Sequence, residues 1–490
     1  MRAPKHLLFP AILVIFSVLM VGCGGSATSP TATGAATQAA TKAPAPQATT
    51  GGSPTTAAAS SQASASGGGA FVPTAGKPYN GTKLNFLICC PTAGQFLALT
   101  NRTKTEFTSQ TGIEVTWDAG PYNAFQQKLL AEGVAGTGAY DNVAWVDSWG
   151  TGVKPYLLPL NDRLAKANMD LKDFPDAYVK ASSSDDGKTI YGVPLRGHAQ
   201  VLYYRKDIFA KLGLQPPTTW QEIAAAGKTI KEKGGGIQPM SVNYGINAGQ
   251  NVFAWLNHLW GNGGDVFDAS GKPIFNSPQG VEATQAYVDL LRKDQLTAPA
   301  STTWGEADAN VEFQKGRSAM FVGWSWIYSN FTDPINAAPE VKDNVGVVAA
   351  PAWAGKAPVS YAQIWPVGIF KSSKHQDASF EYLRWLTSVP VEKEVALDKS
   401  DPKTNNVVVV HYTNLRDPQI NAAWGGLHTV MAKSLETART EPLIPEWPQV
   451  ESILEIAINE MAGGKPVQAT LDKAQKDVND VLVKSGRLKG

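Results

Sequence analysis

Polar and aromatic residues follow a short apolar run near one third of the chain. Asp147, Ser148 and Trp149 come directly after residues 143–146, which read as a buried strand. An ionised carboxylate accepts hydrogen bonds from two hydroxyls, and an indole offers a large rigid apolar face. Asp147 and Trp149 therefore suit a ring that carries several hydroxyls. Structural roles stay open for both, because Asp147 also suits a helix N-cap and Trp149 a core.

A second aromatic group follows the predicted strand 320–322. Trp324 and Trp326 are two residues apart, and on an extended segment such residues point the same way. The spacing predicts that both indoles point in one direction, and we expect them to face a ligand. Trp304, earlier in the chain, is a further candidate for ligand binding. Core packing is the alternative for each of them.

Further candidates are polar or aromatic residues near predicted strand ends and chain crossings. A guanidinium can fork two hydroxyls or a carboxylate, so Arg196 is a candidate ligand or a salt-bridge partner. Asn243 offers an amide or marks a turn, and Trp255 shares its helix with Trp260, so that one of the two belongs to the core. The remaining candidates for ligand binding are His198, Gln363, Trp365 and Trp447.

Catalytic and metal motifs are missing from the sequence. It contains no G-x-S-x-G, no H-E-x-x-H and no EF-hand loop, and its six histidines show no paired spacing. Two Gly-Lys-Thr runs lack the earlier glycine of a phosphate-binding loop, since Ser182 and Glu222 stand in its place. We therefore predict no catalytic residue, no metal and no cofactor.

Charge and length exclude other classes. The 490 residues contain 43 basic and 42 acidic side chains, so the chain has no excess of positive charge of the kind that binds nucleic acid. A chain of this length can hold two or three domains.

Three cysteines are too few for a disulfide framework, and two of them are adjacent. Cys89 and Cys90 end the predicted strand 84–89. Outside the cytoplasm they can form a disulfide between neighbours, and two reduced thiols are the alternative.

The N-terminus has the pattern of a signal peptide, residues 1–22. Arg2 and Lys5 precede an apolar run, residues 7–21, that is short for a membrane span. The run ends before Cys23 in a motif that resembles the bacterial lipobox, with Met20 and Val21 departing from its commonest form. Acylation of Cys23 would anchor the chain to the outer face of the cytoplasmic membrane. A cleaved signal with a chance cysteine is the alternative.

Residues 23–79 are predicted to be a disordered tether. They consist mostly of Ala, Thr, Ser, Gly, Gln and Pro, which bury too little apolar surface to offset ordering entropy. Coil statistics give the tether a reach of about 40 Å.

Folded sequence begins near Asn80. Strand patterns at residues 84–89, 112–117 and 140–147 alternate with helix patterns, which indicates a mostly parallel sheet covered by helices. Further strands are expected at 201–204, 237–243, 320–322, 345–349 and 364–370, and helices at 220–233, 253–260, 277–291, 372–386, 447–461 and 467–484. Thr219 and Glu222 are placed to cap the helix that begins at Trp220.

Four runs resemble the family 1 extracellular solute-binding proteins of ABC importers, and the resemblance extends from Asn80 to the C-terminus. These runs are YGVPLRGHAQVLYYRKDIFAKLGLQPPTTW at 191–220, FTSQTGIEVTW at 107–117, YLLPLND at 156–162 and FQKGRSAM at 313–320.

The resemblance implies a two-lobe, periplasmic-binding-protein-like (type II) α/β fold with a ligand cleft between the lobes. It places 80–195 and about 356–410 in the N-lobe, and 196–355 and about 411–490 in the C-lobe. Ligands of open α/β sheets bind at the carboxyl ends of the strands, and a hinge between two such lobes can close over them.

The implied function is the capture of a carbohydrate, from monosaccharide to oligosaccharide or sugar alcohol, and its delivery to an ABC permease. We expect a lipid-anchored monomer without covalent chemistry. A secreted carbohydrate-active enzyme stays open, although the sequence does not pair two opposed carboxylates for it. A receptor for a non-sugar ligand, such as a glycerophosphodiester or polyamine, is the other alternative.

Overall fold

The computed structural model describes residues 71–90, 94–399 and 407–489, without the side chains of residues 122 and 123. The signal peptide, Cys23 and most of the expected tether lie outside the described residues. Among the helices that are described, none is both long and apolar enough to cross a membrane.

The described chain starts inside the segment expected to be a tether. Phe71 packs 6.1 Å from Phe107 between ring centres, and the Arg384 guanidinium lies 5.5 Å from the Phe71 ring. Thr74 donates its N–H to Glu381 at 2.6 Å. The tether prediction is therefore wrong for residues 71–79, because aromatic residues at 71 and 79 give this stretch apolar surface to bury.

Parallel strands form one end of the sheet. β1 (Lys83–Cys89) pairs in parallel with β2 (Glu114–Gly120) and with β3 (Asn142–Ala144). Between β1 and β2 run α1 (Gly94–Arg102), a π-helical turn and α2 (Thr108–Thr111), and α3 (Tyr122–Ala135) leads to β3. The predicted alternation of strand and helix is confirmed here.

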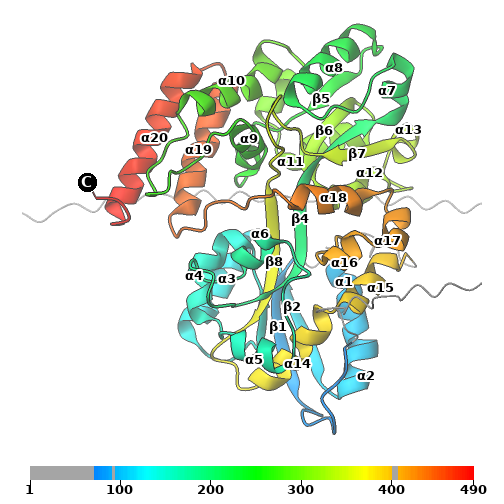
Figure 1. Ribbon diagram of the computed structural model, residues 1–490, viewed down its shortest axis with the longest axis vertical. Coiled ribbons are helices and arrows are strands. Elements are labelled where there is room, and N and C mark those ends of the chain that lie inside the picture. The colour runs from blue at the N-terminus through cyan, green and yellow to red at the C-terminus, as the bar shows by residue number, and fades with distance from the viewer. Residues whose placement is uncertain (1–70, 91–93, 400–406, 490) are drawn as a thin grey trace, which may run out of the picture. The chain divides into compact units, whose positions relative to one another are not determined.

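One long strand, β4 (Val193–Arg205), is shared by two groups of strands. Residues 193–199 pair with β8 (Ala362–Ile369), and residues 200–204 pair with β6 (Ser318–Trp324). β7 (Val345–Ala349) pairs with the second half of β4 on its other side. Figure 1 shows β4 and β8 running side by side. The change of partner falls between Ala199 and Gln200.

The second group contains β5 (Gln238–Ser241), which pairs in parallel with β6. α8 (Trp220–Lys233) leads to β5 and begins with the predicted cap, since Thr219 accepts from the Glu222 N–H and Glu222 accepts in return. α9 (Gln250–Gly261), α10 (Pro278–Arg292) and α11 (Glu306–Gln314) follow.

The strand order is β2-β1-β3-β8-β4-β6-β5, with β7 beside β4. The α/β class is confirmed, but the sheet is mixed rather than mostly parallel. The antiparallel pairs all involve β4 or β8, the strands that return through the middle of the fold.

Helices end the chain. The expected helix at 372–386 is α14 (Gln376–Leu386), and it is followed by four short helices that the sequence reading missed: α15 (Val389–Leu397), α16 (Tyr412–Leu415), α17 (Pro418–Ala423) and α18 (Leu427–Leu435). α18 packs against β4 and β7. α19 (Trp447–Ala462) and α20 (Val467–Lys484) pack on each other and on α10 (Figure 1). Short helices elsewhere are α4 (Gly150–Val153), α5 (Asn161–Lys166), α6 (Asp176–Ala181), α7 (Lys206–Leu212), α12 (Tyr328–Phe331) and α13 (Pro339–Lys342).

Candidate functional site

Two sets of strand ends meet near the middle of β4. The parallel strands β1 and β3 end beside the second half of β8, where Ala144 pairs with Val367. Arg196 of β4 pairs with Trp365, and His198 pairs with Gln363. From the other side, β6 ends with Trp324 opposite Gln200. The segment that follows β3 and the carboxyl end of β6 thus approach the same short stretch of β4, residues 196–200.

Asp147 begins a 3-10 turn, Asp147–Trp149, that follows β3. Its side chain is fully buried. Oδ1 accepts from the Ser148 N–H at 3.1 Å, and Oδ2 has no hydrogen-bond partner among the described residues. Burial, and then the charge of Glu441, raise the pKa of Asp147 well above its ordinary value. Asp147 is not the N-cap of this turn, because Val146 holds that position.

Aromatic rings surround Trp365 in the middle of β8. Trp149 lies edge-on to Trp365 with 6.0 Å between ring centres, and Trp365 lies 6.3 Å from Phe96. The Arg196 guanidinium lies 5.4 Å from the Phe96 ring and donates from Nε to Gln95 Oε1 at 3.2 Å. Burial lowers the pKa of Arg196 to about 10, which leaves it charged at neutral pH. Arg196, Trp149 and Trp365 are therefore brought together.

A second aromatic group lies at the end of β6. Trp324 contacts His198 at 6.1 Å, Phe253 at 5.7 Å and Tyr361 at 5.1 Å between ring centres. The Nδ1 atom of His198 has no hydrogen-bond partner among the described residues. Burial, and then the Arg196 charge, lower the pKa of His198 well below its ordinary value, so its imidazole is neutral.

Trp326 does not share an extended segment with Trp324. β6 ends at Trp324, and Ser325–Ile327 forms a 3-10 turn. The expectation that the two indoles point the same way rested on an extended chain and is wrong on that point. Trp326 is half-buried, whereas Trp324 is buried.

Asn243 and Trp304 come from neighbouring loops. The Gly245 N–H donates to the Trp304 carbonyl at 2.9 Å, and the Tyr244 N–H donates to Ser301. Asn243 is buried, and its Nδ2 has no hydrogen-bond partner among the described residues. The loop after β5 therefore contains an unused amide donor, and its backbone is hydrogen-bonded to that of Trp304 two residues further on.

Trp255 and Trp447 are buried and have hydrogen-bond partners inside the protein. Trp255 is fully buried, and its Nε1 donates to Thr284 on α10 at 2.8 Å. Trp447 is fully buried at the start of α19 and donates to Glu441 Oε2 at 2.8 Å. Both indole N–H groups are already used inside the protein.

Glu441 is a residue that the sequence reading missed. It lies between α18 and α19, and its Oε2 accepts from the Tyr361 hydroxyl at 3.0 Å as well as from Trp447. Burial raises the pKa of Glu441 to about 7, against hydrogen bonds from Ser148, Tyr361 and Trp447 that favour the ionised form. The sequence signal was an acid inside a proline-rich stretch that also contains Arg439 and Trp447.

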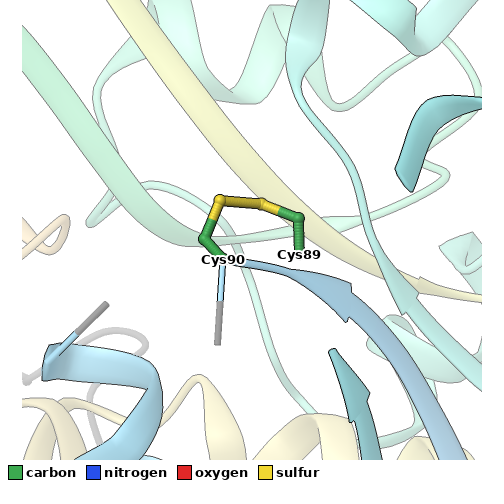
Figure 2. Close-up of a disulfide and its surroundings, with 2 residues drawn as sticks. All are labelled: Cys89 and Cys90. Atoms are coloured by element: carbon green, nitrogen blue, oxygen red, sulfur yellow. A yellow bond between two sulfur atoms is a disulfide. The ribbon is translucent and has the colours of Figure 1, made fainter. Parts of the chain in front are cut away.

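A disulfide joins Cys89 and Cys90 at the end of β1 (Figure 2). The structure thus has the oxidised pair, one of the two states that the sequence left open. Cys89 is fully buried in one cluster with Trp145, Trp149 and Trp365.

The arrangement combines a buried carboxyl, a guanidinium, amide groups and several indoles, a set suited to binding rather than to metal chemistry. Among the described residues no group of three or more His, Cys, Asp or Glu is placed to hold a metal ion. The features expected of a ligand site thus gather around one strand.

The chain belongs to the bacterial extracellular solute-binding protein family, whose model matches residues 91–393. Family membership implies an extracytoplasmic location.

Similar proteins extend over most of the chain. A protein of Sinorhizobium fredii named "Probable amino-acid ABC transporter periplasmic-binding protein" is 25% identical over 84% of this chain and 92% of its own length. The mannitol-binding protein of Pseudomonas aeruginosa is 25% identical over 59% of this chain and 65% of its own. Maltose-bound T. maritima MalE3 has the same fold, with a TM-score of 0.71, 23% identity, and coverage of 82% of this chain and 100% of that one.

Proposed function

We propose that this protein captures a carbohydrate outside the cytoplasmic membrane and delivers it to an ABC permease. The observation that carries the proposal is the convergence of the segment that follows β3 and the carboxyl end of β6 on residues 196–200 of β4. Carboxyl, guanidinium and amide groups suit hydroxyls, and indoles suit the C–H face of a sugar ring.

The proposed contacts come from both sides of β4. On the β3 and β8 side the ligand meets Asp147, Trp149, Arg196, Gln363 and Trp365. On the β5 and β6 side it meets Asn243, Trp304, Trp324 and Trp326, with His198 between the two sides. Trp255 is left out as a core residue, and Trp447 acts through Glu441.

Hinge closure is the proposed motion. A strand that changes partners between Ala199 and Gln200 offers a place where two lobes can bend toward each other. We keep the N-lobe at 80–195 and about 356–410, and the C-lobe at 196–355 and about 411–490, as a proposed division.

Attachment and chemistry are further parts of the proposal. Acylated Cys23 anchors the protein, which acts as a monomer and leaves its ligand chemically unchanged. The ligand reaches the permease by opening of the hinge.

An amino acid is a second candidate ligand. The name of the Sinorhizobium fredii relative refers to amino acids. Arg196 carries the positive charge that a carboxylate would need, and Asp147 offers carboxyl oxygens as acceptors for an ammonium group. This candidate differs from the first only in ligand chemistry.

Calorimetric titration of the full-length protein in detergent tests the proposal. The panel contains maltose, D-mannitol, ribitol, L-amino acids, a glycerophosphodiester and spermidine, and each mixture is checked for breakdown products. Saturable one-to-one binding of an intact carbohydrate is the expected result. Binding of amino acids alone would show that the ligand is an amino acid. Accumulation of breakdown products would show that the protein is an enzyme.

A further inference from the structure

The Cys89–Cys90 disulfide lies at the same edge of the sheet as the proposed ligand residues. β1 and β3 are parallel neighbours, so Cys89 ends its strand at the edge where Asp147 and Trp149 follow β3. Cys89 belongs to the buried cluster of Trp149 and Trp365, and the half-buried Cys90 packs against that cluster. The disulfide therefore lies next to the indoles of Trp149 and Trp365.

The backbone holds Cys90 in a conformation that presents it at this edge. Cys90 has a φ of 61°, in the left-handed region that side chains other than glycine seldom adopt. Its N–H donates to the Gly120 carbonyl at 2.8 Å, which extends the pairing of β1 with β2 by one residue. Closing the ring to Cys89 fixes both side chains (Figure 2).

The neighbour of Cys89 on β2 is a glycine. Gly120 is the register partner of Cys89, and paired residues of parallel strands point to the same face of a sheet. A Cβ added at Gly120 would meet no heavy atom of the described residues within 4 Å. The disulfide thus has indoles as neighbours on β8 and after β3, and on β2 a glycine beside which the described residues place no side chain.

We propose that the Cys89–Cys90 disulfide is part of the ligand site and forms an apolar platform for the C–H face of the bound carbohydrate. Sulfur is soft and polarisable and makes favourable contacts with apolar and aromatic groups. A closed disulfide has no rotamers left to order when a ligand binds, so its contact has a low entropic cost. This inference rests on the proposed function and adds a residue pair to its site.

The first test compares affinities. Among maltose, D-mannitol and ribitol, the sugar that binds the wild-type protein most tightly is titrated into the double variant Cys89→Ser/Cys90→Ser. Loss of the platform should weaken binding about 3- to 10-fold. Gly120→Val, which adds a side chain next to Cys89 and leaves the disulfide intact, should weaken binding as well.

A second test detects contact directly. Saturating sugar should slow the reduction of the disulfide by a water-soluble phosphine, followed by alkylation and mass measurement, because the ligand covers Cys90. A disulfide with a purely structural role would be reduced at the same rate with and without sugar.

Trp255→Phe is the control for indirect effects, because it loosens the core between α9 and α10 without touching the site. It should lower the midpoint of thermal unfolding and leave affinity unchanged. Unchanged affinity in the double variant together with unprotected reduction overturns the platform while leaving the proposed function intact. If no carbohydrate binds the wild-type protein, the proposed function fails and this inference fails with it.

Discussion

Tyr361 donates its hydroxyl proton to Glu441 across 3.0 Å, and the two residues are 80 positions apart in the chain. Tyr361 precedes β8, and Glu441 lies in the segment that leads from α18 to α19. The backbones of the two segments are also paired, since Tyr361 and Arg439 form a parallel bridge. The buried side chain of Glu441 therefore connects the segment before α19 to the segment before β8.

Glu441 should make stability depend on pH. Its pKa rises from 4.5 in the unfolded chain to about 7 in the folded one, so folding takes up a proton between these values. The cost of this burial is absent below pH 4.5, grows as pH rises to 7 and is constant above. Glu441→Gln keeps an oxygen for Tyr361 and Trp447 and should be more stable than wild type by about 2 kcal/mol at pH 8.

Urea unfolding at pH 4 and pH 8 measures this effect. The stability gain of the glutamine variant should vanish at pH 4. A gain of equal size at both values would contradict the assignment, since it would not come from titration. Neighbouring acids with raised pKa values, Asp147 and Glu451, are expected to keep part of the wild-type pH dependence in the variant.

Asp147→Asn should separate affinity from stability. The substitution keeps the shape of the side chain, removes a charge that burial disfavours and leaves a worse acceptor for hydroxyls. We expect carbohydrate affinity to fall about 10- to 100-fold, as for loss of a hydrogen bond to a charged group. The free energy of unfolding at pH 8 should rise or stay unchanged.

Calorimetry and denaturant melts check this pair of results. Asp343→Asn serves as control, because the Asp343 side chain is 71% exposed and pairs with Lys342 at the surface. Equal affinity of wild type and Asp147→Asn would remove Asp147 from the site.

Trp149 and Trp365 should act on the ligand as a pair. Their rings lie edge-on at 6.0 Å, so each orients the other. Trp149→Ala and Trp365→Ala should each reduce affinity at least tenfold, and the double variant should lose less than the sum of the two free energies. Additive losses in this double-mutant cycle would argue that the indoles bind independently.

Asn257 should control the stability of the middle of the fold. Its Nδ2 donates to Gln200 on β4, and its Oδ1 accepts from the Tyr361 N–H at 2.8 Å. Asn257→Ala leaves these buried groups without partners, which should lower the free energy of unfolding by about 2–4 kcal/mol.

Denaturant unfolding tests the role of Asn257 against a surface asparagine. Asn344→Ala removes one exposed hydrogen bond, to the Glu340 carbonyl at 2.9 Å, and should change stability by less than about 0.5 kcal/mol. Similar losses in the two variants would show that Asn257 does not connect β4 to the segment before β8.

Local features were predictable from the sequence because their causes are local. The capping box of Thr219 and Glu222, the start of α10 at Pro278 and both ends of α20 depend on neighbours within a few residues. The alternation of strands and helices from β1 to β3 followed from apolar periodicity in the same way.

Long-range features were not predictable, because distant contacts cause them. Glu441 is buried by partners that include Tyr361, far away in the chain, and the proline-rich stretch around it does not reveal that contact. From the sequence, Trp255 is equally consistent with ligand binding and with core packing. Its hydrogen bond to Thr284, which requires the assembled fold, identifies it as a core residue. The turn at Ser325 that separates Trp324 from Trp326, and the antiparallel direction of β8, also require the assembled fold.

The continuity of β4 makes the site sensitive to chain length. Side chains of a strand alternate between two faces, so deletion of one residue near Gly197 would turn every following side chain of β4 to the opposite face. The part of β4 before the deletion would keep its register with β8. The part after it, residues 200–204, would lose its register with β6. We expect β4 to tolerate no single-residue insertion or deletion, so that natural variation in ligand choice must arise through exchange of side chains.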